Sequence, residues 1–334
     1  MKECYLYSKL ENLKTKCNLC NHKCVIANGK TGKCFVRKNI DGSLYSLVYD
    51  KLVAEHIDPI EKKPLFHFLP GSYSYSIATA GCNFRCFFCQ NYEISQLSLE
   101  DHQIPGYLST PEEIVARALK NNCKSISYTY TEPTVYFELA YDTSILAKRN
   151  GLRNVFVTNG YMTTEAIDML KGYLDAANID LKGFSEEFYR KYTGAKLKPV
   201  LENISYMRSL GIWIEVTTLL IPGLNDSEEE LVNIAQFLKG VSIEIPWHIS
   251  AYFPNYKSTI PPTSPAKVLK AVNIGKKIGL KYVYGGNIYS SDAENTKCPK
   301  CGENIIIRKD YSIFRNDIEN NLCKNCGEYI SGVF

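Results

Sequence analysis

The 334-residue sequence has no apolar run that approaches the roughly 20 residues that a membrane-spanning helix needs. Its start, MKECYLYSKLENLKTKC, also lacks the apolar stretch of a signal peptide. No block of Lys or Arg stands out, although the formal net charge is +4 and the pI is near 8.3. Neither a membrane nor a nucleic acid is therefore expected as a partner. We expect a cytoplasmic protein of ordinary globular composition.

Cysteine, in contrast, is abundant, with 13 residues. A disulfide framework is excluded for a cytoplasmic protein, because cytosolic thiols are kept reduced and an odd count leaves one unpaired. Metal ligation is the better explanation. Apart from Cys4 and Cys123, the cysteines form three groups that predict three separate sites: Cys17, Cys20, Cys24 and Cys34; Cys82, Cys86 and Cys89; and Cys298, Cys301, Cys323 and Cys326.

Short apolar runs alternate with amphipathic stretches of helical period between residues 74 and 290. This alternation is typical of parallel βα units, and the almost continuous apolarity of the runs suits strands covered on both faces. Right-handed crossovers would close such strands into a partial (β/α)6-type barrel, an α/β fold with its chemistry at the carboxyl ends of the strands. The predicted strands are 74–80, 125–130, 154–158, 176–181, 213–221 and 248–253, with 281–285 as a candidate seventh.

Three segments follow from this pattern: a cysteine-rich segment with a lid or connector at 1–73, the barrel at 74–290, and a short tail at 291–334. Helix signals support the barrel. Thr110 and Glu113 predict a capping box, and Ser227 with Glu230 repeats it. Helices are predicted to end at Gly151, Gly211, Gly240 and Gly279.

The stretch GCNFRCFFCQN, residues 81–91, begins where the first predicted strand ends, so it should lie at the active end of the barrel. Three thiolates from one loop can hold three irons of a [4Fe–4S] cluster, whereas a closed electron-transfer cluster takes four protein ligands. The open fourth iron is then available for catalysis, as in catalytic zinc sites. The alternative is a zinc site or a cluster completed by a distant cysteine. Cys123, the one left over in the barrel, lies at the opposite end and is expected to be buried packing.

C-x3-C-x2-C with an aromatic residue, Phe88, before the last cysteine resembles the radical S-adenosylmethionine (SAM) superfamily. The resemblance implies an enzyme in which SAM binds the open iron through its amino and carboxylate groups. One electron from the cluster would cleave SAM to methionine and a 5′-deoxyadenosyl radical, which abstracts hydrogen from a substrate. A low-potential electron donor, ferredoxin or flavodoxin, is the implied partner.

Residues at other strand ends extend this resemblance. Tyr130, Thr131 and Glu132 stand where the superfamily has Gly-Gly-Glu, which implies that Glu132 accepts a hydrogen bond from the SAM amine. Asp180 and Lys182 could face SAM or pair with each other. The complete set of implied SAM-binding residues is Phe88, Thr131, Glu132, Thr158, Asn159, Asp180 and Lys182.

A narrower resemblance rests on DPIEKKPLFHFLPG, GCNFRCFFCQN, YTYTEPT, DLKGFSEEFY, EVTTLLIPGLND and the tail CPKCG…CGEYISGVF. Together these motifs resemble the radical SAM enzyme of the AmmeMemoRadiSam system, which is related to activating enzymes of glycyl-radical proteins such as pyruvate formate-lyase. The resemblance implies a protein, peptide or small-metabolite substrate and partner proteins of that system. Two alternatives stay open: an RNA-modifying radical SAM enzyme, and a non-catalytic iron- and zinc-binding scaffold. The sequence identifies no catalytic acid or base.

The two flanking cysteine groups differ in regularity. Cys298, Cys301, Cys323 and Cys326 have the spacing of a zinc ribbon, with two knuckles closing a tetrahedral site. The N-terminal run C-x2-C-x3-C-x9-C, formed by Cys17, Cys20, Cys24 and Cys34, could hold zinc or a second cluster, and Cys4 or His22 could replace one ligand. Its departure from the ferredoxin spacing favours zinc.

Overall fold

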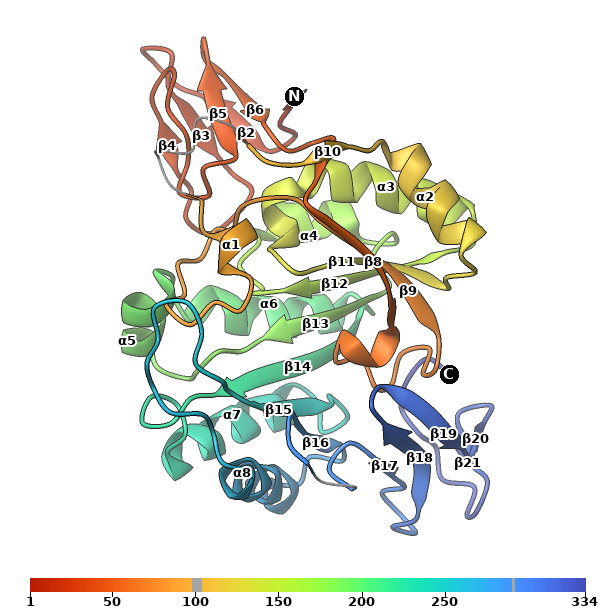
Figure 1. The fold of residues 1–334 in the computed structure, drawn as a ribbon. Helices are drawn as coiled ribbons and strands as arrows, with labels where there is room; N and C mark the ends of the chain where they lie inside the picture. Colours follow the sequence, from red (N-terminus) through yellow and green to blue (C-terminus); the bar gives the residue numbers. More distant parts are fainter. Residues whose placement is uncertain (98–103, 290–291) are drawn as a thin grey trace. The chain divides into compact units, whose positions relative to one another are not determined.

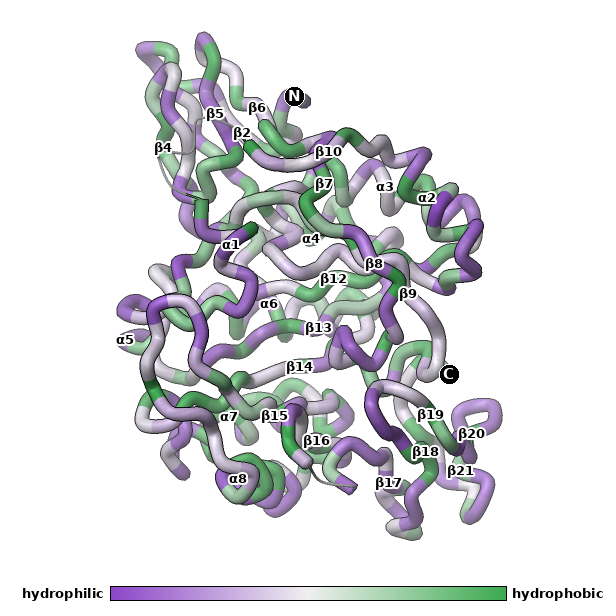
Figure 2. The backbone as a smooth tube through the Cα atoms, in the orientation of Figure 1, coloured by the Kyte–Doolittle hydropathy of each residue, from purple (hydrophilic) through white to green (hydrophobic). Residues whose placement is uncertain are grey.

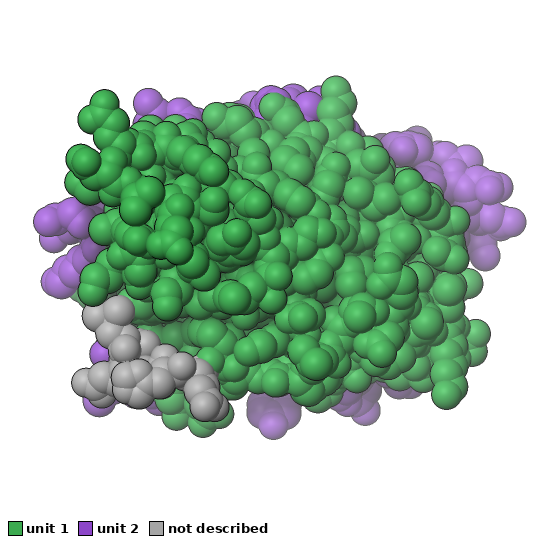
Figure 3. Space-filling model, turned by 90° about the horizontal axis from the view of Figure 1, so that it is seen from above, with its two compact units in different colours: residues 1–58, 73–176, 192–195 green, residues 59–72, 177–191, 196–334 purple. Residues whose placement is uncertain are grey.

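The computed structural model describes residues 1–97, 104–289 and 292–334. The chain separates into two compact units, coloured differently in Figure 3. Unit 1 comprises Met1–Asp58, Tyr73–Ala176 and Tyr192–Ala195, and unit 2 comprises Pro59–Ser72, Ala177–Lys191 and Lys196–Phe334. The three segment boundaries drawn from sequence composition stay predictions. None of the helices in the described ranges combines the length and the apolarity that a bilayer crossing requires.

Unit 1 contains neighbouring strands in the order β12, β11, β9 and β8. β11 pairs in parallel with both β9 and β12. Helices α2 and α3 pack against each other and against β11 (Figure 1). All of β11 is buried, as expected of a strand covered on both faces. The elements are β8 Ala54–Pro59, β9 Tyr73–Ala78, α1 Tyr92–Ser95, α2 Pro111–Lys120, β11 Ser125–Tyr128, the 3₁₀ helix η2 Pro133–Tyr136, α3 Phe137–Arg149, β12 Arg153–Thr158 and α4 Thr164–Leu170.

Small antiparallel sheets make up the N-terminal part of unit 1, and Figure 2 shows hydrophilic residues at the tips of their hairpins. Their strands are too short to show a period in the sequence, which is why the sequence predicts none there. A buried ion pair between Arg37 of β5 and Glu138 of α3, at 2.5 Å, anchors this part. The strands are β1 Lys2–Glu3, β2 Tyr7–Lys9, β3 Thr15–Cys17, β4 Val25–Ile26, β5 Arg37–Ile40, β6 Ser43–Ser46 and β7 Lys51–Leu52, which pairs with β10 Tyr107–Leu108.

Unit 2 contains neighbouring strands in the order β16, β15, β14 and β13, and β15 pairs in parallel with both β14 and β16. Helix α6 packs on β14, and α8 packs on β15, β16 and α7. The elements that lie wholly or mostly in unit 2 are the 3₁₀ helix η1 Ile60–Lys62, β13 Ala176–Asp180, α5 Glu186–Phe188, the π-helical turn η3 Tyr189–Thr193, α6 Lys198–Ser209, β14 Trp213–Leu220, α7 Glu228–Val241, β15 Trp247–Ala251, α8 Pro265–Ile278 and β16 Val283–Gly286.

The C-terminal tail belongs to unit 2 and packs on residues 59–72. A parallel bridge joins Phe68 to Val333, and the Arg308 guanidinium donates to the Phe66 carbonyl at 2.7 Å while lying over its ring. The tail and residues 59–72 also share a hydrophobic cluster, which consists of Phe66, Tyr282, Tyr284, Cys298, Ile305, Cys323 and Ile330. The tail strands are β17 Thr296–Lys297, β18 Asn304–Lys309, β19 Ser312–Asn316, β20 Ile318–Glu319 and β21 Leu322–Cys323.

The seven predicted strands are confirmed as β9 and β11 to β16. The capping box at Thr110 and Glu113 is also confirmed. The prediction of the second capping box is only half right. Ser227 accepts a hydrogen bond from the Glu230 backbone amide, but the Glu230 carboxylate accepts one from the Phe184 amide and does not cap the helix.

Three of the four predicted helix ends are confirmed, since Gly151, Gly211 and Gly279 follow their helices with positive φ. The prediction for Gly240 is wrong, because α7 continues through it to Val241. A glycine inside a helix costs only about 1 kcal/mol, which the packing of α7 offsets.

A buried polar network holds residues 59–72 in unit 2. The Glu215 carboxylate accepts from the backbone amides of Phe66 and His67 at 3.0 and 2.8 Å and pairs with His248 Nε2 at 2.6 Å. His67 Nδ1 lies 2.7 Å from the Ser331 carbonyl, so it carries the proton, and Nε2 accepts from the Tyr284 hydroxyl at 2.6 Å. Burial lowers the pKa of His67 to about 4. This part of the connector is therefore a buried anchor, not a solvated linker.

The depressed pKa of His67 predicts acid sensitivity of unit 2. Between pH 6.5 and 4 the unfolded chain binds a proton on this residue and the native state does not, so stability is lost as the pH falls. We expect this residue to remove about 2 kcal/mol of unfolding free energy between pH 7 and 5. Urea unfolding at each pH, followed by tryptophan fluorescence, measures this loss of unfolding free energy, because both tryptophans, Trp213 and Trp247, lie in unit 2. His67→Gln should show the shallower pH dependence, and equal slopes for the two proteins would contradict the assignment.

Candidate active site in unit 1

The cluster loop, residues 81–91, leads from β9 to α1 in unit 1. It starts at Gly81, whose amide donates to the Ile94 carbonyl at 2.8 Å and whose φ is +98°. A Cβ added there would lie 2.7 Å from a Val36 methyl, so this position requires glycine. The contacts of Gly81 therefore fix the position at which the cluster loop starts.

The three cysteines of the cluster loop lie in a mostly buried setting. Cys86 is buried, and Cys82 and Cys89 are half-buried. The Phe84 amide donates to Cys82 Sγ at 3.3 Å, and Cys89 Sγ lies 3.1 Å from Ser95 Oγ. Burial, followed by the charge of Glu132, raises the pKa of the Cys82 thiol. Without a metal this thiol stays protonated, whereas a bound cation would displace the proton.

Glu132, directly after β11, is the centre of the polar network in unit 1. Its side chain is only 2% exposed. One carboxylate oxygen accepts from Thr158 Oγ1 at 2.7 Å and from the Thr134 amide at 3.0 Å, and the other accepts from the Asn159 amide at 2.8 Å. Burial raises the pKa of Glu132, and the hydrogen bonds oppose that shift. Three of the predicted SAM-binding residues, Glu132, Thr158 and Asn159, are thus brought together.

Asn83, inside the cluster loop, links the cysteines to this network, and sequence reasoning missed it. Its Oδ1 accepts from Asn159 Nδ2 at 2.7 Å. Within the described ranges its Nδ2 is buried and has no hydrogen-bond partner. The only sequence signal is its place directly after Cys82. An unpartnered buried donor beside three thiols suits a site that is completed by another group.

Tyr130 explains how the chain manages without the glycines of the superfamily motif. Its φ is +61°, a left-handed conformation that favours glycine. Its hydroxyl donates to the Asp58 carboxylate, and its carbonyl accepts from Asn91 Nδ2 at 2.6 Å. The backbone turn that glycine normally permits is therefore kept by side-chain contacts.

The remaining predicted SAM-binding residues lie in different places. Thr131 Oγ1 donates to the Thr79 carbonyl at 2.8 Å, next to Glu132 in unit 1. Phe88 is buried in the cluster loop with its ring edge-on to Phe87. Asp180 and Lys182 belong to unit 2 and pair with each other at 2.9 Å, which was one of their two predicted roles.

The tail cysteines of unit 2 form a closed group. Sγ of Cys298 and Cys326 lie 3.6 Å apart, and those of Cys301 and Cys323 lie 3.9 Å apart. Zinc–sulfur bonds of 2.3 Å in a tetrahedron place the sulfurs ~3.8 Å apart. Within residues 1–97, 104–289 and 292–334, this is the one group of three or more His, Cys, Asp or Glu whose ligand atoms all lie within 4.8 Å of one another. The spacing therefore suits a single zinc ion.

Comparison with known proteins places this geometry in a family. A family model described as "Radical SAM superfamily" matches residues 76–238, which include the cluster loop and the Glu132 network. An uncharacterized protein of Methanocaldococcus jannaschii is 47% identical over 92% of both chains. A second protein of that organism, named as a candidate glycyl-radical enzyme activating enzyme, is 30% identical over 62% of this chain and 77% of its own.

The chain belongs to the radical SAM superfamily. It is an enzyme of the radical SAM type, for which the family implies a [4Fe–4S] cluster, SAM and a source of electrons. The fold agrees: Streptococcus suis SuiB bound to SAM aligns with a TM-score of 0.52, at 13% identity, over 69% of this chain and 53% of that one. The narrower AmmeMemoRadiSam resemblance stays a prediction, since none of these relatives carries that name.

Tyr130 offers a test of how this radical SAM site is supported. Tyr130→Phe removes a donor from the buried Asp58 carboxylate, which should lower the stability of unit 1 by about 1–2 kcal/mol. Hydrogen–deuterium exchange of the β9 and β11 amides measures the loss without unfolding unit 2. Tyr73→Phe, at a half-exposed tyrosine at the start of β9, is the matched control and should change stability by less than about 0.5 kcal/mol. Equal protection in both variants would refute the proposed support.

Proposed function

We propose that this radical SAM enzyme holds its catalytic [4Fe–4S] cluster on Cys82, Cys86 and Cys89 and removes a hydrogen atom from a protein or peptide substrate. The observation that carries the proposal is the three-cysteine loop directly after β9, hydrogen-bonded through Asn83 to the Glu132 network. Three cysteines on one short loop leave one iron of a cubane without a protein ligand.

The residues of the cluster loop fit an iron–sulfur cluster better than zinc. Thiolates that bind different irons of one cluster stand further apart than the ~3.8 Å of a zinc tetrahedron. Unlike the tail cysteines, the loop cysteines do not gather their ligand atoms within 4.8 Å, as far as the described ranges extend. The cluster and SAM would supply a one-electron cleavage that ends in hydrogen abstraction.

The chain's own residues would bind and shield SAM. Glu132 is a buried carboxylate suited to an ammonium group, and its hydrogen bonds to Thr158 and Asn159 hold it in one orientation. Phe84 and Phe88, exposed by only 1% and 3%, line the loop with apolar surface. Such surroundings exclude water and tune the potential of a metal centre.

A protein or peptide substrate is supported by the relatives. One of them is named as a candidate glycyl-radical enzyme activating enzyme, and a more distant one, 22% identical over 48% of this chain, is the pyruvate formate-lyase-activating enzyme of Clostridium pasteurianum. A small metabolite is the second candidate, because a protein of Saccharolobus islandicus named probable GTP 3′,8-cyclase matches 39% of this chain at 32% identity. Mass spectrometry of candidate proteins after reaction in deuterated water would detect exchange or cleavage at an abstracted position.

We further propose that the tail holds one zinc ion, that ferredoxin or flavodoxin supplies the electron, and that the enzyme works in the cytoplasm. Cys298 and Cys323 lie inside the hydrophobic cluster of unit 2, which supports a structural role for the zinc.

The two metal sites should be independent, and reciprocal variants test this. Cys82→Ala should lose the catalytic cluster and all formation of 5′-deoxyadenosine while keeping one zinc per chain. Cys301→Ser, at an exposed tail cysteine, should lose zinc and keep the cluster of the loop. Metal analysis and a dithionite-driven assay with SAM measure both. Joint loss of zinc and cleavage in Cys82→Ala would show that the sites are coupled.

Glu132→Gln should weaken SAM binding, because a charge-assisted hydrogen bond to the SAM amine is lost. Such bonds contribute about 1.5–3 kcal/mol, which corresponds to a Kd roughly 10–100 times higher. Isothermal titration under anaerobic conditions measures the Kd, and iron analysis verifies that the cluster is retained. Glu93→Gln, at an exposed carboxylate in α1, is the control. A Kd equal to that of the unaltered enzyme would remove Glu132 from the SAM site.

A further inference from the structure

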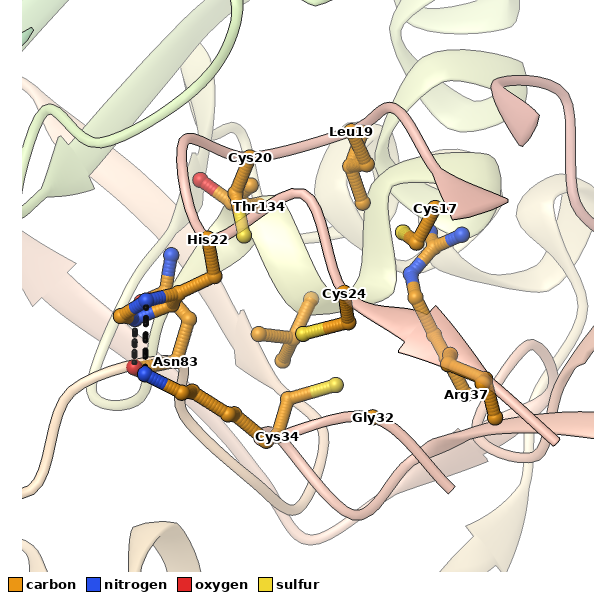
Figure 4. Close-up of a pocket in the computed structure, with 13 residues that line it drawn as sticks. Cys17, Leu19, Cys20, His22, Cys24, Gly32, Cys34, Arg37, Asn83 and Thr134 are labelled. Carbon is orange, nitrogen blue, oxygen red and sulfur yellow. Dashed lines mark hydrogen bonds between the residues drawn. The ribbon is translucent and has the colours of Figure 1, made fainter. Parts of the chain in front are cut away.

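The N-terminal cysteines line one pocket of unit 1 (Figure 4). The pocket has about 340 Å³ of space free of protein atoms, part of it open to solvent. Figure 4 shows the sulfur atoms of Cys20, Cys24 and Cys34 turned toward the space between them. Cys17 completes the set, whereas Cys4 does not line the pocket. Four thiols thus face a common cavity although they come from a stretch of irregular spacing.

The sulfur atoms of the N-terminal cysteines are not gathered as closely as those of the tail cysteines. A zinc tetrahedron needs sulfurs ~3.8 Å apart, as the tail cysteines have. In the described part of the chain no N-terminal cysteines gather three ligand atoms within 4.8 Å. The four sulfurs are therefore spread more widely than the ligands of one zinc ion, as are thiolates that each bind a different iron of a cubane.

Arg37 gives an independent sign of an anionic occupant. Its side chain is 2% exposed and lines the pocket, and Figure 4 shows its guanidinium beside Cys17. Nη2 donates to the Glu138 carboxylate at 2.5 Å, but Nε and Nη1 have no hydrogen-bond partner in the described ranges. Two buried, unpartnered donors cost free energy unless a bound group accepts from them. A cluster held by four thiolates is negatively charged, and its sulfur atoms would be acceptors for Nε and Nη1 of Arg37.

The pocket adjoins the cluster loop. His22 Nε2 lies 2.8 Å from the Asn83 carbonyl, directly after Cys82. The Arg85 guanidinium donates to the Lys33 carbonyl. A Cβ added at Gly81 would lie 3.1 Å from the Cys34 carbonyl oxygen. Two hydrogen bonds and the close approach at Gly81 therefore hold the two cysteine segments side by side within unit 1.

We propose that Cys17, Cys20, Cys24 and Cys34 hold a second [4Fe–4S] cluster, closed by four protein ligands, which passes electrons to the cluster loop. Only the passing of electrons rests on the proposed function; the ligand set does not. One electron enters from a low-potential donor protein and reduces the second cluster. The same electron leaves to the cluster on Cys82, Cys86 and Cys89, and the second cluster returns to its oxidised state.

Metal content tests the ligand set without any catalysis. Anaerobically reconstituted protein should hold about eight irons and one zinc per chain. A variant with Cys82→Ala, Cys86→Ala and Cys89→Ala together should keep about four irons, with a reduced-state electron paramagnetic resonance signal that SAM does not alter. About four irons and two zincs in the unaltered protein would overturn the proposal in favour of zinc.

Single variants identify the ligands. Cys20→Ser should lose about four irons and keep the part of the signal that SAM shifts. The matched control is Cys4→Ser, at a buried cysteine of unit 1 outside the pocket. This variant should keep about eight irons per chain. Loss of iron in Cys4→Ser would overturn this ligand set.

The relay is tested by comparing two reductants on Cys20→Ser. Reduced ferredoxin should drive 5′-deoxyadenosine formation at least tenfold more slowly, relative to dithionite, than it does in the unaltered enzyme. An unchanged ratio would overturn the relay. If SAM cleavage is absent with both reductants in the unaltered enzyme while the eight irons are present, the proposed function fails and the second cluster stands.

Discussion

A single buried carboxylate holds the active end of unit 1 together. Glu132 is 2% exposed and accepts from the backbone or hydroxyl groups of Thr134, Thr158 and Asn159. Burying a charge is expensive unless hydrogen bonds replace the lost water, and these donors do so. Because they come from η2 and from the end of β12, the carboxylate also sets the distance between the ends of β11 and β12. Asn159 carries that order onward to Asn83 in the cluster loop.

The spacing of sulfur atoms separates the three cysteine groups into two kinds. The tail group is contracted to the dimensions of one tetrahedral ion, with sulfur pairs 3.6 and 3.9 Å apart. The described cysteines of the other two groups are spread more widely. Such a difference cannot be predicted from the number of residues between cysteines, because contacts with distant parts of the chain place each cysteine. At Gly81 the limit is a Val36 methyl, which leaves no room for a Cβ.

The strands of the barrel could be predicted because a buried strand needs an unbroken apolar run, as in β11 and β14. The meeting of the four tail sulfurs could be predicted because metal ligands usually cluster in sequence. Contacts between distant segments could not. The Glu230 carboxylate was expected to cap its own helix, yet it binds Phe184, which lies 46 residues away. The roles of Asn83 and Arg37 could not be predicted either, since a single asparagine beside a cysteine and a single arginine have many ordinary roles.

The tail shows why the three segments predicted from composition differ from the two compact units of the structure. A ribbon of this size buries too little apolar surface to be stable alone, so it needs a metal and a neighbour. Residues 59–72 supply the neighbour: Phe66 packs in the cluster that includes Cys298 and Cys323, and Leu69 donates its amide to Val333 at 2.6 Å. Two stretches far apart in the sequence thus complete one core. A zinc ion there would act on the stability of unit 2, because two of its ligands are themselves core residues.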